Sequence, residues 1–221
     1  IIRLLGAGGM GAVYQAWDAE LGVAVAIKVI RPEVMDDPAT AEEVSRRFKR
    51  ELLLARQVTH KNVVRIHDLG EIEGIKYITM SYVDGSDLST IMMREGQLPV
   101  ATVLRIARQA VAGLVEAHKA GVVHRDLKPA NVMVVARAGR LLPKLLDLGI
   151  ARAFADVEPA VDREALDGAT DASLTQAGDV VGSPAFMAPE QWFDPAGVDH
   201  RAELGDGPGR LDRARDAARR G

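Results

Sequence analysis

The stretch "HRDLKPANVMV", residues 124–134, places a histidine, an arginine, an aspartate, a lysine and an asparagine between two apolar segments. Two valines precede it, and apolar residues return directly after the asparagine. Burying unpaired charge is costly, so such a stretch predicts a polar loop set into the core, with a chemical reason for its charges.

The composition restricts the class of protein. The chain has 221 residues, of which 48% are hydrophobic, enough for a core within one or two domains. A net charge of −3 indicates no general attraction to nucleic acid, and the absence of cysteine excludes disulfides and thiolate catalysis. No apolar run is long enough to span a bilayer, and the first residues lack a secretory cleavage pattern. We therefore expect a globular, cytoplasmic protein.

The first part of the chain has mostly the pattern of a sheet. Residues 1–30 are typical of strand, turn and strand, with a turn at Leu21-Gly22. Residues 39–58 have the period of a helix. Further strands are predicted at 63–69 and 76–83.

The second part begins helical. A turn at 84–86 separates it from the strands, and a helix is predicted from Pro99, as its first residue, to a stop at Gly121.

Two charged residues fall on apolar faces of the first part. Lys28 lies on the strand face of Ala26 and Ile30, and Glu51 lies on the helix stripe of Phe48. If both are buried, each relieves the cost of the other as an ion pair. The alternative is that Lys28 extends to water and Glu51 lies at the edge of the stripe.

The segment Gly6-Ala7-Gly8-Gly9-Met10-Gly11 fits the pattern G-x-G-x-x-G and is followed by Val13. The pattern alone is weak, because it occurs in hairpin turns and in dinucleotide-binding loops. The dinucleotide form needs a helix after the last glycine, whereas "AVYQAW" continues as a strand. A glycine hairpin leaves backbone N–H groups accessible to phosphate oxygens, and Lys28 could then hold phosphates while Glu51 fixes its position.

The opening stretch fits the loop pattern H-R-D-L-x-x-x-N without a mismatch. Downstream the chain contains Asp147-Leu148-Gly149 and "GSPAFMAPEQ" at 182–191. Together with "GAGGMGAV", "VAIK" and Glu51, these motifs resemble the catalytic domain of bacterial eukaryotic-like (Hanks-type) serine/threonine protein kinases. The resemblance extends from residue 1 to about residue 191.

The resemblance implies an α+β, two-lobed protein kinase-like fold. We expect an N-lobe at residues 1–83, an antiparallel sheet with one helix and a partly missing first strand. We expect a mainly helical, truncated C-lobe at 84–204. Such a fold implies transfer of the ATP γ-phosphate to serine or threonine hydroxyls of proteins.

The resemblance also implies roles for the charged residues. Asp126 would be the catalytic base, and Lys128 would neutralise charge on the transferred group. Asn131 and Asp147 would hold Mg²⁺, with Mn²⁺ as an alternative metal. Taken alone, Asp147 would more simply be a turn residue or a helix cap.

ATP would lie between the lobes. The residues implied around it are Gly6, Ala7, Gly8, Gly9, Met10, Gly11, Val13, Ala26, Lys28, Met80, Tyr82, Val83, Asp87 and Met133. Among them Met80 would be the gatekeeper, Asp87 would face the ribose, and the backbone of residues 81–83 would meet the adenine. Lys28 and Glu51 would complete the catalytic set as an ion pair.

Several positions depart from the family pattern. Leu148 replaces a phenylalanine but stays apolar, Ser81 replaces a hinge glutamate, and Ser183 replaces a threonine. Residues 205–221, "GDGPGRLDRARDAARRG", stand where a central helix is expected. A frameshift would produce this aberrant tail, and a divergent, truncated kinase is the alternative. Without that helix we expect residues 100–150 to be poorly held.

The segment that follows Asp147 is long and acidic, and we expect it to form a mobile loop. By resemblance Arg125 would receive a phosphate from this loop, with Thr175 as the best acceptor, because a phosphate adds charge that can pair with arginine. An unmodified Thr175 is the alternative. Ser183 would instead hydrogen-bond near Asp126.

Two functional classes stay open. One is an ATP:protein serine/threonine phosphotransferase, whose longer parent protein could be membrane-anchored. The other is an inactive kinase fragment that acts as a nucleotide-binding or interaction module. A small-molecule phosphotransferase is a weaker third, because "GSPAFMAPEQ" is not expected in such enzymes. None of the three involves nucleic acid.

Overall fold

The computed structural model describes residues 1–8, 11–30, 41–137, 139–149, 186 and 199. The strands are β1 (Arg3–Gly8), β2 (Gly11–Asp18), β3 (Val23–Ile30), β4 (Ile66–Ile72), β5 (Ile75–Ser81), β6 (Ser86–Asp87), β7 (Val132–Arg137) and β8 (Arg140–Leu145). The helices are α1 (Ala41–Gln57), α2 (Leu88–Glu95), α3 (Val100–Lys119) and the short 3-10 helix η2 (Pro129–Asn131).

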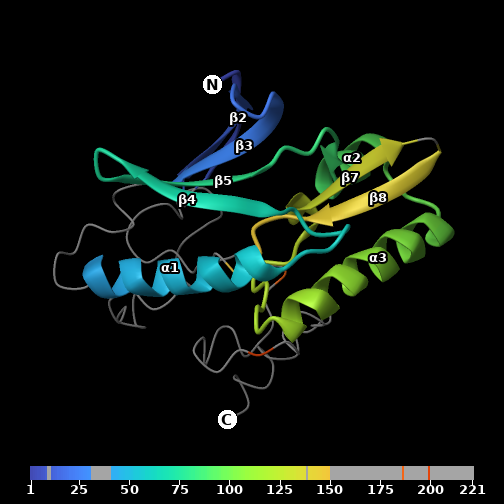
Figure 1. The fold of residues 1–221 in the computed structure, drawn as a ribbon. Helices are drawn as coiled ribbons and strands as arrows, with labels where there is room; N and C mark the ends of the chain where they lie inside the picture. The colour runs from blue at the N-terminus through green and yellow to red at the C-terminus, as the bar shows by residue number, and fades with distance from the viewer. Residues whose placement is uncertain (9–10, 31–40, 138, 150–185, 187–198, 200–221) are drawn as a thin grey trace, which may run out of the picture.

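The first sheet has five antiparallel strands in the order β1-β2-β3-β5-β4. Helix α1 lies along one side of this sheet, beneath β4 in Figure 1. On β3, the buried residues Ala26, Lys28 and Ile30 alternate along the strand and therefore share one face. Phe48 of α1 is 1% exposed and belongs to the same core as Ala26 and Ile30. The helix predicted at 39–58 is confirmed.

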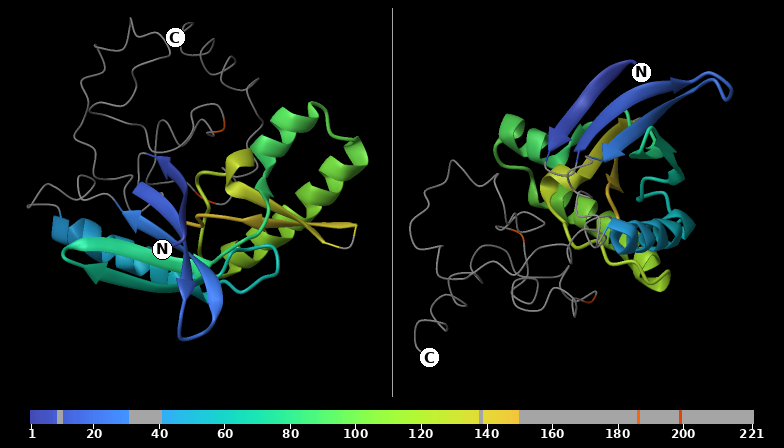
Figure 2. Two further views of the ribbon diagram at one scale, coloured as in Figure 1. Left: turned by 90° about the horizontal axis from the view of Figure 1, so that it is seen from above. Right: turned by 90° about the vertical axis from the view of Figure 1, so that its left-hand side faces the viewer.

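The second part combines α2 and α3 with a small sheet in the order β6-β7-β8. Figure 2 shows these elements on the opposite side of the molecule from the five-stranded sheet and α1. Hydrophobic periodicity did not predict the β7–β8 hairpin. Its turn contains Gly139, whose φ of +70° is the left-handed conformation that glycine adopts without strain.

One strand-like contact joins the two parts. The Leu145 N–H at the end of β8 donates to the Asn62 carbonyl over 2.8 Å, and the Val64 N–H donates to the Leu145 carbonyl over 2.9 Å. The Asn62 side chain is fully buried and donates to the Pro143 carbonyl over 2.7 Å. Segment 62–64 is thus attached to β8, although it lies between α1 and β4 in the chain.

This contact accounts for the main error in the predicted boundaries. The strand predicted at 63–69 begins in the structure at Ile66. Val63 and Val64 are paired with Leu145 of β8, and contact with β5 starts only at Arg65, whose carbonyl accepts from the Ser81 N–H over 3.0 Å. The turn predicted at 84–86 is also partly wrong, since Ser86 pairs with Val134 of β7. The helix predicted from Pro99 begins at Val100, with Pro99 as its N-cap. The lobe boundaries at residues 83 and 204 stay predictions, and the tail at 205–221 lies outside the described residues.

Helix α3 has two apolar faces. One is buried and consists of Ile106, Gly113, Leu114 and Ala117. The other is exposed and consists of Val100, Val103, Leu104, Val111 and Val115. Although α3 has 20 residues, no helix in the described part of the chain has the length and hydropathy needed to cross a bilayer.

We expect Gly11→Ala to destabilise the five-stranded sheet. Gly11 has a φ of +140°, and an added Cβ would collide with the Val29 carbonyl oxygen on the neighbouring strand. The unfavourable backbone conformation alone costs about 1–3 kcal/mol. Thermal unfolding followed by circular dichroism measures the loss. Gly8→Ala is the matched control, because nothing lies within 4 Å of its added Cβ. Equal losses in the two variants would show that the collision with Val29 is not the cause.

Candidate active site

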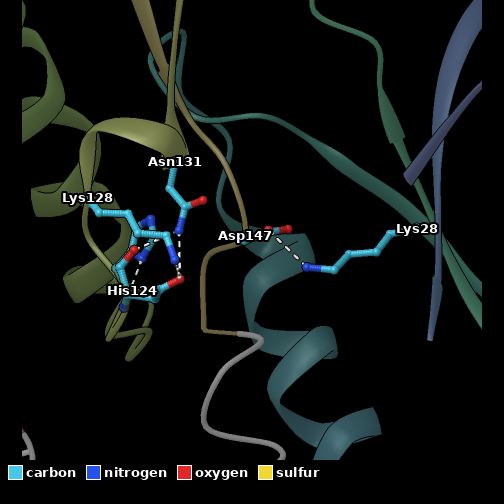
Figure 3. Close-up of polar contacts among 6 residues, drawn as sticks. Lys28, His124, Lys128, Asn131 and Asp147 are labelled. Carbon is cyan, nitrogen blue, oxygen red and sulfur yellow. Dashed lines mark hydrogen bonds and ion pairs between the residues drawn. The ribbon is translucent and has the colours of Figure 1, made fainter. Parts of the chain in front are cut away.

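Three polar side chains of the loop between α3 and β7 form one cluster (Figure 3). The Asn131 amide donates to the Asp126 carboxylate over 2.9 Å and to the Asp126 carbonyl over 2.7 Å. Lys128 Nζ lies 2.9 Å from the same carboxylate oxygen, Oδ2. The Asp126 and Lys128 side chains are only 15% and 23% exposed, so solvent screens their attraction weakly. The structure thus brings together three of the residues predicted from the sequence.

The backbone of this loop is supported by a histidine that was not among the predicted site residues. His124 is fully buried, and its Nδ1 accepts a hydrogen bond from the Asp126 N–H over 3.4 Å. Between them Arg125 has a φ of +67°, a conformation that is rare outside glycine. Such strain persists only where the surroundings fix it, and it is concentrated at functional sites. The sequence signal for His124 was its position directly after two apolar valines.

Lys28 and Glu51 are both buried, at 6% and 7% exposure, so the alternative, in which they reach the surface, is wrong. Lys28 Nζ lies 2.9 Å from Oδ2 of Asp147 (Figure 3). Within the described residues, this is the ion pair that Lys28 makes, and the expected pair with Glu51 is not formed. The physical reason is that Asp147 lies two residues after the end of β8 and presents its carboxylate to Lys28 on β3, where it compensates the buried ammonium.

The turn at Asp147 accounts for this orientation. Asp147 has a φ of +53° and Gly149 a φ of +68°, so two of three consecutive residues are left-handed. Leu148 between them is 3% exposed and belongs to the hydrophobic core, so it does keep the apolar character expected of it. An added Cβ at Gly149 would lie 3.0 Å from Val122, which leaves little room for a larger residue.

Asn131 and Asp147 lie next to each other although 16 positions separate them in the chain. Asn131 immediately precedes β7, Asp147 follows β8 by one residue, and the Leu146 N–H donates to the Asn131 carbonyl over 2.9 Å. The Asn131 nitrogen is turned to Asp126, and Figure 3 shows its side-chain oxygen on the side of Asp147. An amide oxygen and a carboxylate are ligands that Mg²⁺ accepts together with phosphate oxygens, so the residues fit the implied metal.

The glycine segment forms the hairpin between β1 and β2, with Gly8 opposite Gly11. Because β2 continues directly after Gly11, the dinucleotide-binding alternative is wrong. Added Cβ atoms at Gly6 and Gly8 would meet nothing within 4 Å, so the backbone there is open to a ligand. Gly9 and Met10 lie outside the described residues.

Several residues predicted to surround ATP share one face of the sheet. Val13 pairs with Lys28, and Ala26 pairs with Met80, so all four side chains point to the same side as Ile30. Ala26 and Met80 are both 6% exposed.

The other predicted nucleotide residues come from the start of the second part. Asp87 lies directly opposite Met133 in the β6–β7 pair, and Val83 packs against the hydrophobic core. Tyr82 follows β5 immediately, and its hydroxyl accepts a hydrogen bond from Arg3 over 3.2 Å. The structure therefore places these residues around the junction of the two parts.

Two of these residues have local partners. Ser81, at the end of β5, hydrogen-bonds through its hydroxyl to His67 Nε2 over 3.0 Å. Asp87 caps α2 and accepts from the Thr90 N–H, the Thr90 hydroxyl and the Ser89 hydroxyl. Burial opposes ionisation of Asp87, but the hydrogen bonds from Thr90 and Ser89 outweigh it and lower its pKa below the ordinary value. An ionised Asp87 therefore stabilises the helix that begins beside the site.

The family model described as the protein kinase domain matches residues 1–201. The chain belongs to the protein kinase family. Serine/threonine-protein kinase pkn3 of Myxococcus xanthus is 40% identical over 203 residues, which are 91% of this kinase chain and 34% of pkn3. PknD of Mycobacterium tuberculosis is 38% identical over 204 residues, 92% of this chain and 27% of PknD. The kinase chain thus spans about a third of the length of these relatives, or less.

A solved kinase structure agrees with this assignment. The crystal structure of the PknI kinase domain of Mycobacterium tuberculosis matches with a TM-score of 0.66 and 33% sequence identity, over 92% of this kinase chain and 68% of that chain. The resemblance to bacterial serine/threonine kinases and the two-lobed fold class are therefore confirmed. Thr175 and Ser183 lie outside the described residues, whereas Arg125 lies in the strained loop beside Asp126.

We expect Asp87 to make the kinase chain less stable in acid. Because its folded-state pKa is lowered, the ionised cap contributes stability above the unfolded-state pKa of about 3.9 and loses it as the pH falls through the folded-state value. Losing a cap costs about 1 kcal/mol. Asp87→Asn caps without titrating, so the free energy of unfolding should fall relative to this variant between about pH 5 and pH 3. A pH-independent difference would be evidence against the cap.

Proposed function

We propose that the chain carries the catalytic centre of an ATP-dependent kinase that phosphorylates serine and threonine hydroxyls of proteins. The observation that carries the proposal is the position of Asp126, Asn131 and Asp147. The first two are hydrogen-bonded to each other, and the third is held beside them by the β7–β8 hairpin while it contacts Lys28 from the opposite sheet. A base, two metal ligands and a phosphate-binding cation thus converge from both parts of the fold.

In the proposed reaction, the substrate hydroxyl oxygen attacks the γ-phosphorus of ATP and Asp126 accepts the hydroxyl proton. The bond between the γ-phosphorus and the β,γ-bridging oxygen breaks, and ADP leaves. Both side-chain contacts of the Asp126 carboxylate recorded in the described part of the chain fall on Oδ2, which leaves Oδ1 for the incoming hydroxyl. Lys128 supplies a positive charge beside the transferred phosphoryl group. The Asn131 amide keeps the carboxylate oriented, so little reorganisation is needed during transfer.

When nucleotide binds, Lys28 and Asp147 would each exchange their mutual contact for a different partner. The Lys28 ammonium is the group suited to the phosphates, and Asp147 with Asn131 is the oxygen pair suited to Mg²⁺, with Mn²⁺ as an alternative. A bound metal would neutralise charge on the phosphates. The ion pair of 2.9 Å places the two side chains beside each other, where the ammonium and the carboxylate could both reach a bound Mg-ATP. Glu51, buried on α1 within the same core region, would become the partner that positions Lys28.

The inactive nucleotide-binding or interaction module is the second candidate function. It is favoured by one observation: the exposed apolar face of α3, the helix that leads into the loop of Asp126. A polypeptide that binds Mg-ATP but transfers no phosphate would fit this alternative. A kinase activity measured on the chain itself would fit the first proposal.

We expect Asp126→Asn to lower phosphoryl transfer from Mg-ATP to a generic protein substrate by about 10²-fold or more, since general-base catalysis contributes about 10²–10⁴-fold. Nucleotide affinity should persist, because Asp126 acts on the hydroxyl. Lys28→Met should weaken both transfer and nucleotide binding. Radiolabel transfer and calorimetric titration measure the two quantities. Asp68→Asn, at a carboxylate that is 73% exposed on β4, is the matched control and should change neither. Transfer at the wild-type rate in both site variants would refute the assignment.

We also propose that Thr175 is a phosphorylation site that activates the enzyme through Arg125. A phosphate carries a charge of roughly −1.5 to −2 and can pair with an arginine that directly precedes the catalytic aspartate. After incubation with ATP, mass spectrometry should find Thr175 modified, and Thr175→Ala should lower the transfer rate. Ser183→Ala is the comparison variant. It removes the hydroxyl expected to hydrogen-bond near Asp126 and should leave the phosphorylation of Thr175 detectable. An active enzyme with unmodified Thr175, or an unchanged rate in Thr175→Ala, would disprove this mode of regulation.

A further inference from the structure

One side-chain contact connects the first strand with the segment that follows β5. The Arg3 guanidinium donates from Nε to the Gln15 side-chain oxygen over 2.9 Å and from Nη2 to the Tyr82 hydroxyl over 3.2 Å. Arg3 lies on β1, Gln15 on β2, and Tyr82 directly after β5. The contact therefore joins residues that are 79 positions apart in the chain.

The strand register shows on which face this contact lies. Arg3 is directly opposite Gln15, Gln15 is opposite Ala26, and Ala26 is opposite Met80. Residues directly opposite each other point to the same face of a sheet, and side chains two positions apart on a strand do so as well. Arg3 and Gln15 therefore share the face of Ala26 and Lys28, which is the face proposed to hold the nucleotide.

Strand β1 has few other attachments. It is the edge strand of the sheet, all six of its residues are exposed, and it pairs with β2 alone. That pairing is itself interrupted by a register shift between Leu4 and Gly6. Among the described residues, the Arg3–Tyr82 hydrogen bond is the one side-chain hydrogen bond that connects β1 with an element other than β2.

Strand β1 carries the glycine segment that begins at Gly6, so its position determines how closely that backbone approaches a ligand. We propose that Arg3, oriented by Gln15, clasps β1 to the Tyr82 hydroxyl and thereby holds the backbone of Gly6 to Gly8, at the end of β1, against bound nucleotide. Arg3 is a positioning residue in this scheme: it acts on nucleotide affinity through β1 and takes no part in the transfer of the phosphoryl group. The inference rests on the proposed function, because it assumes that the nucleotide binds on this face.

The test is a double-mutant cycle on the affinity for Mg-ATP, measured by calorimetric titration of the full chain. Arg3→Met and Tyr82→Phe each remove one partner and should weaken binding by about two- to tenfold, the effect of one hydrogen bond. The double variant should bind no more weakly than either single variant, because both substitutions remove the same contact. Stopped-flow release of a fluorescent ATP analogue should become faster to the same extent.

Two further variants distinguish the clasp from a direct attraction between the Arg3 charge and the phosphates. Arg3→Lys keeps the positive charge but lacks the planar fork that reaches Gln15 and Tyr82 together, so it should not restore binding. If Arg3 simply attracted the phosphates, Arg3→Lys would bind normally and Tyr82→Phe would have no effect, which would overturn the proposal. Tyr14→Phe, on the opposite face of β2 from Gln15, is the matched hydroxyl control and should bind as the wild type does.

The remaining outcomes are also decisive. Additive effects of Arg3→Met and Tyr82→Phe would show that the two residues act independently and would overturn the clasp. A wild-type chain that binds Mg-ATP with an affinity unchanged in all variants would overturn the clasp alone and leave the proposed function standing. A wild-type chain that does not bind Mg-ATP would overturn the proposed function, and the clasp with it.

Discussion

The arrangement of the whole site depends on the attachment of residues 62–64 to Leu145. Two backbone hydrogen bonds and the buried Asn62 side chain attach the segment before β4 to the end of β8, and we call this attachment the joint between the two sheets. Asp147 comes two residues after this joint, and Lys28 lies on the neighbouring sheet at a distance that the joint determines. A buried lysine needs a compensating charge. If the two sheets shifted relative to each other at the joint, Lys28 would lose its contact with Asp147, and the cost of burying the ammonium would destabilise the fold. The joint therefore connects fold stability with the geometry of catalysis.

Backbone strain at two loop residues also contributes to the geometry of the site. Arg125 and Asp147 both have left-handed backbones, each beside a residue that is almost completely buried: His124 in one case and Leu148 in the other. Left-handed conformations of non-glycine residues cost of order 1–3 kcal/mol each. Core packing of the neighbouring residue opposes that cost and keeps the strained residue in place. A buried neighbour thus helps to fix the backbone at two charged residues of the proposed site, Arg125 and Asp147.

Local patterns in the sequence predicted much of this structure. The charges of "HRDLKPAN", the glycine hairpin and the period of α1 each lie within a short stretch, and the structure brings Asp126, Lys128 and Asn131 together as expected. The partner of Lys28 could not be predicted in the same way, because the choice between Glu51 and Asp147 depends on how a helix and a hairpin pack against β3. The pairing of 62–64 with β8 was missed for a similar reason: an apolar run such as "VVRI" has the same pattern whichever strand it joins. Arg3 has a role that exists only through contacts with residues distant in the chain, Gln15 and Tyr82.

The two faces of α3 determine which end of this helix unfolds first in local opening. Folding removes Ile106, Leu114 and Ala117 from water, whereas Val100, Leu104 and Val111 remain in contact with it and contribute little to holding the helix. Gly113 lies close to Asn62 and Leu145, so the helix is attached most firmly near the joint and most weakly near its first turn. Amide hydrogens of α3 should therefore exchange with solvent through local opening that starts at Val100 and ends at Gly113. Such opening would loosen the outer half of the helix while the hydrogen bonds around Asp126 persist.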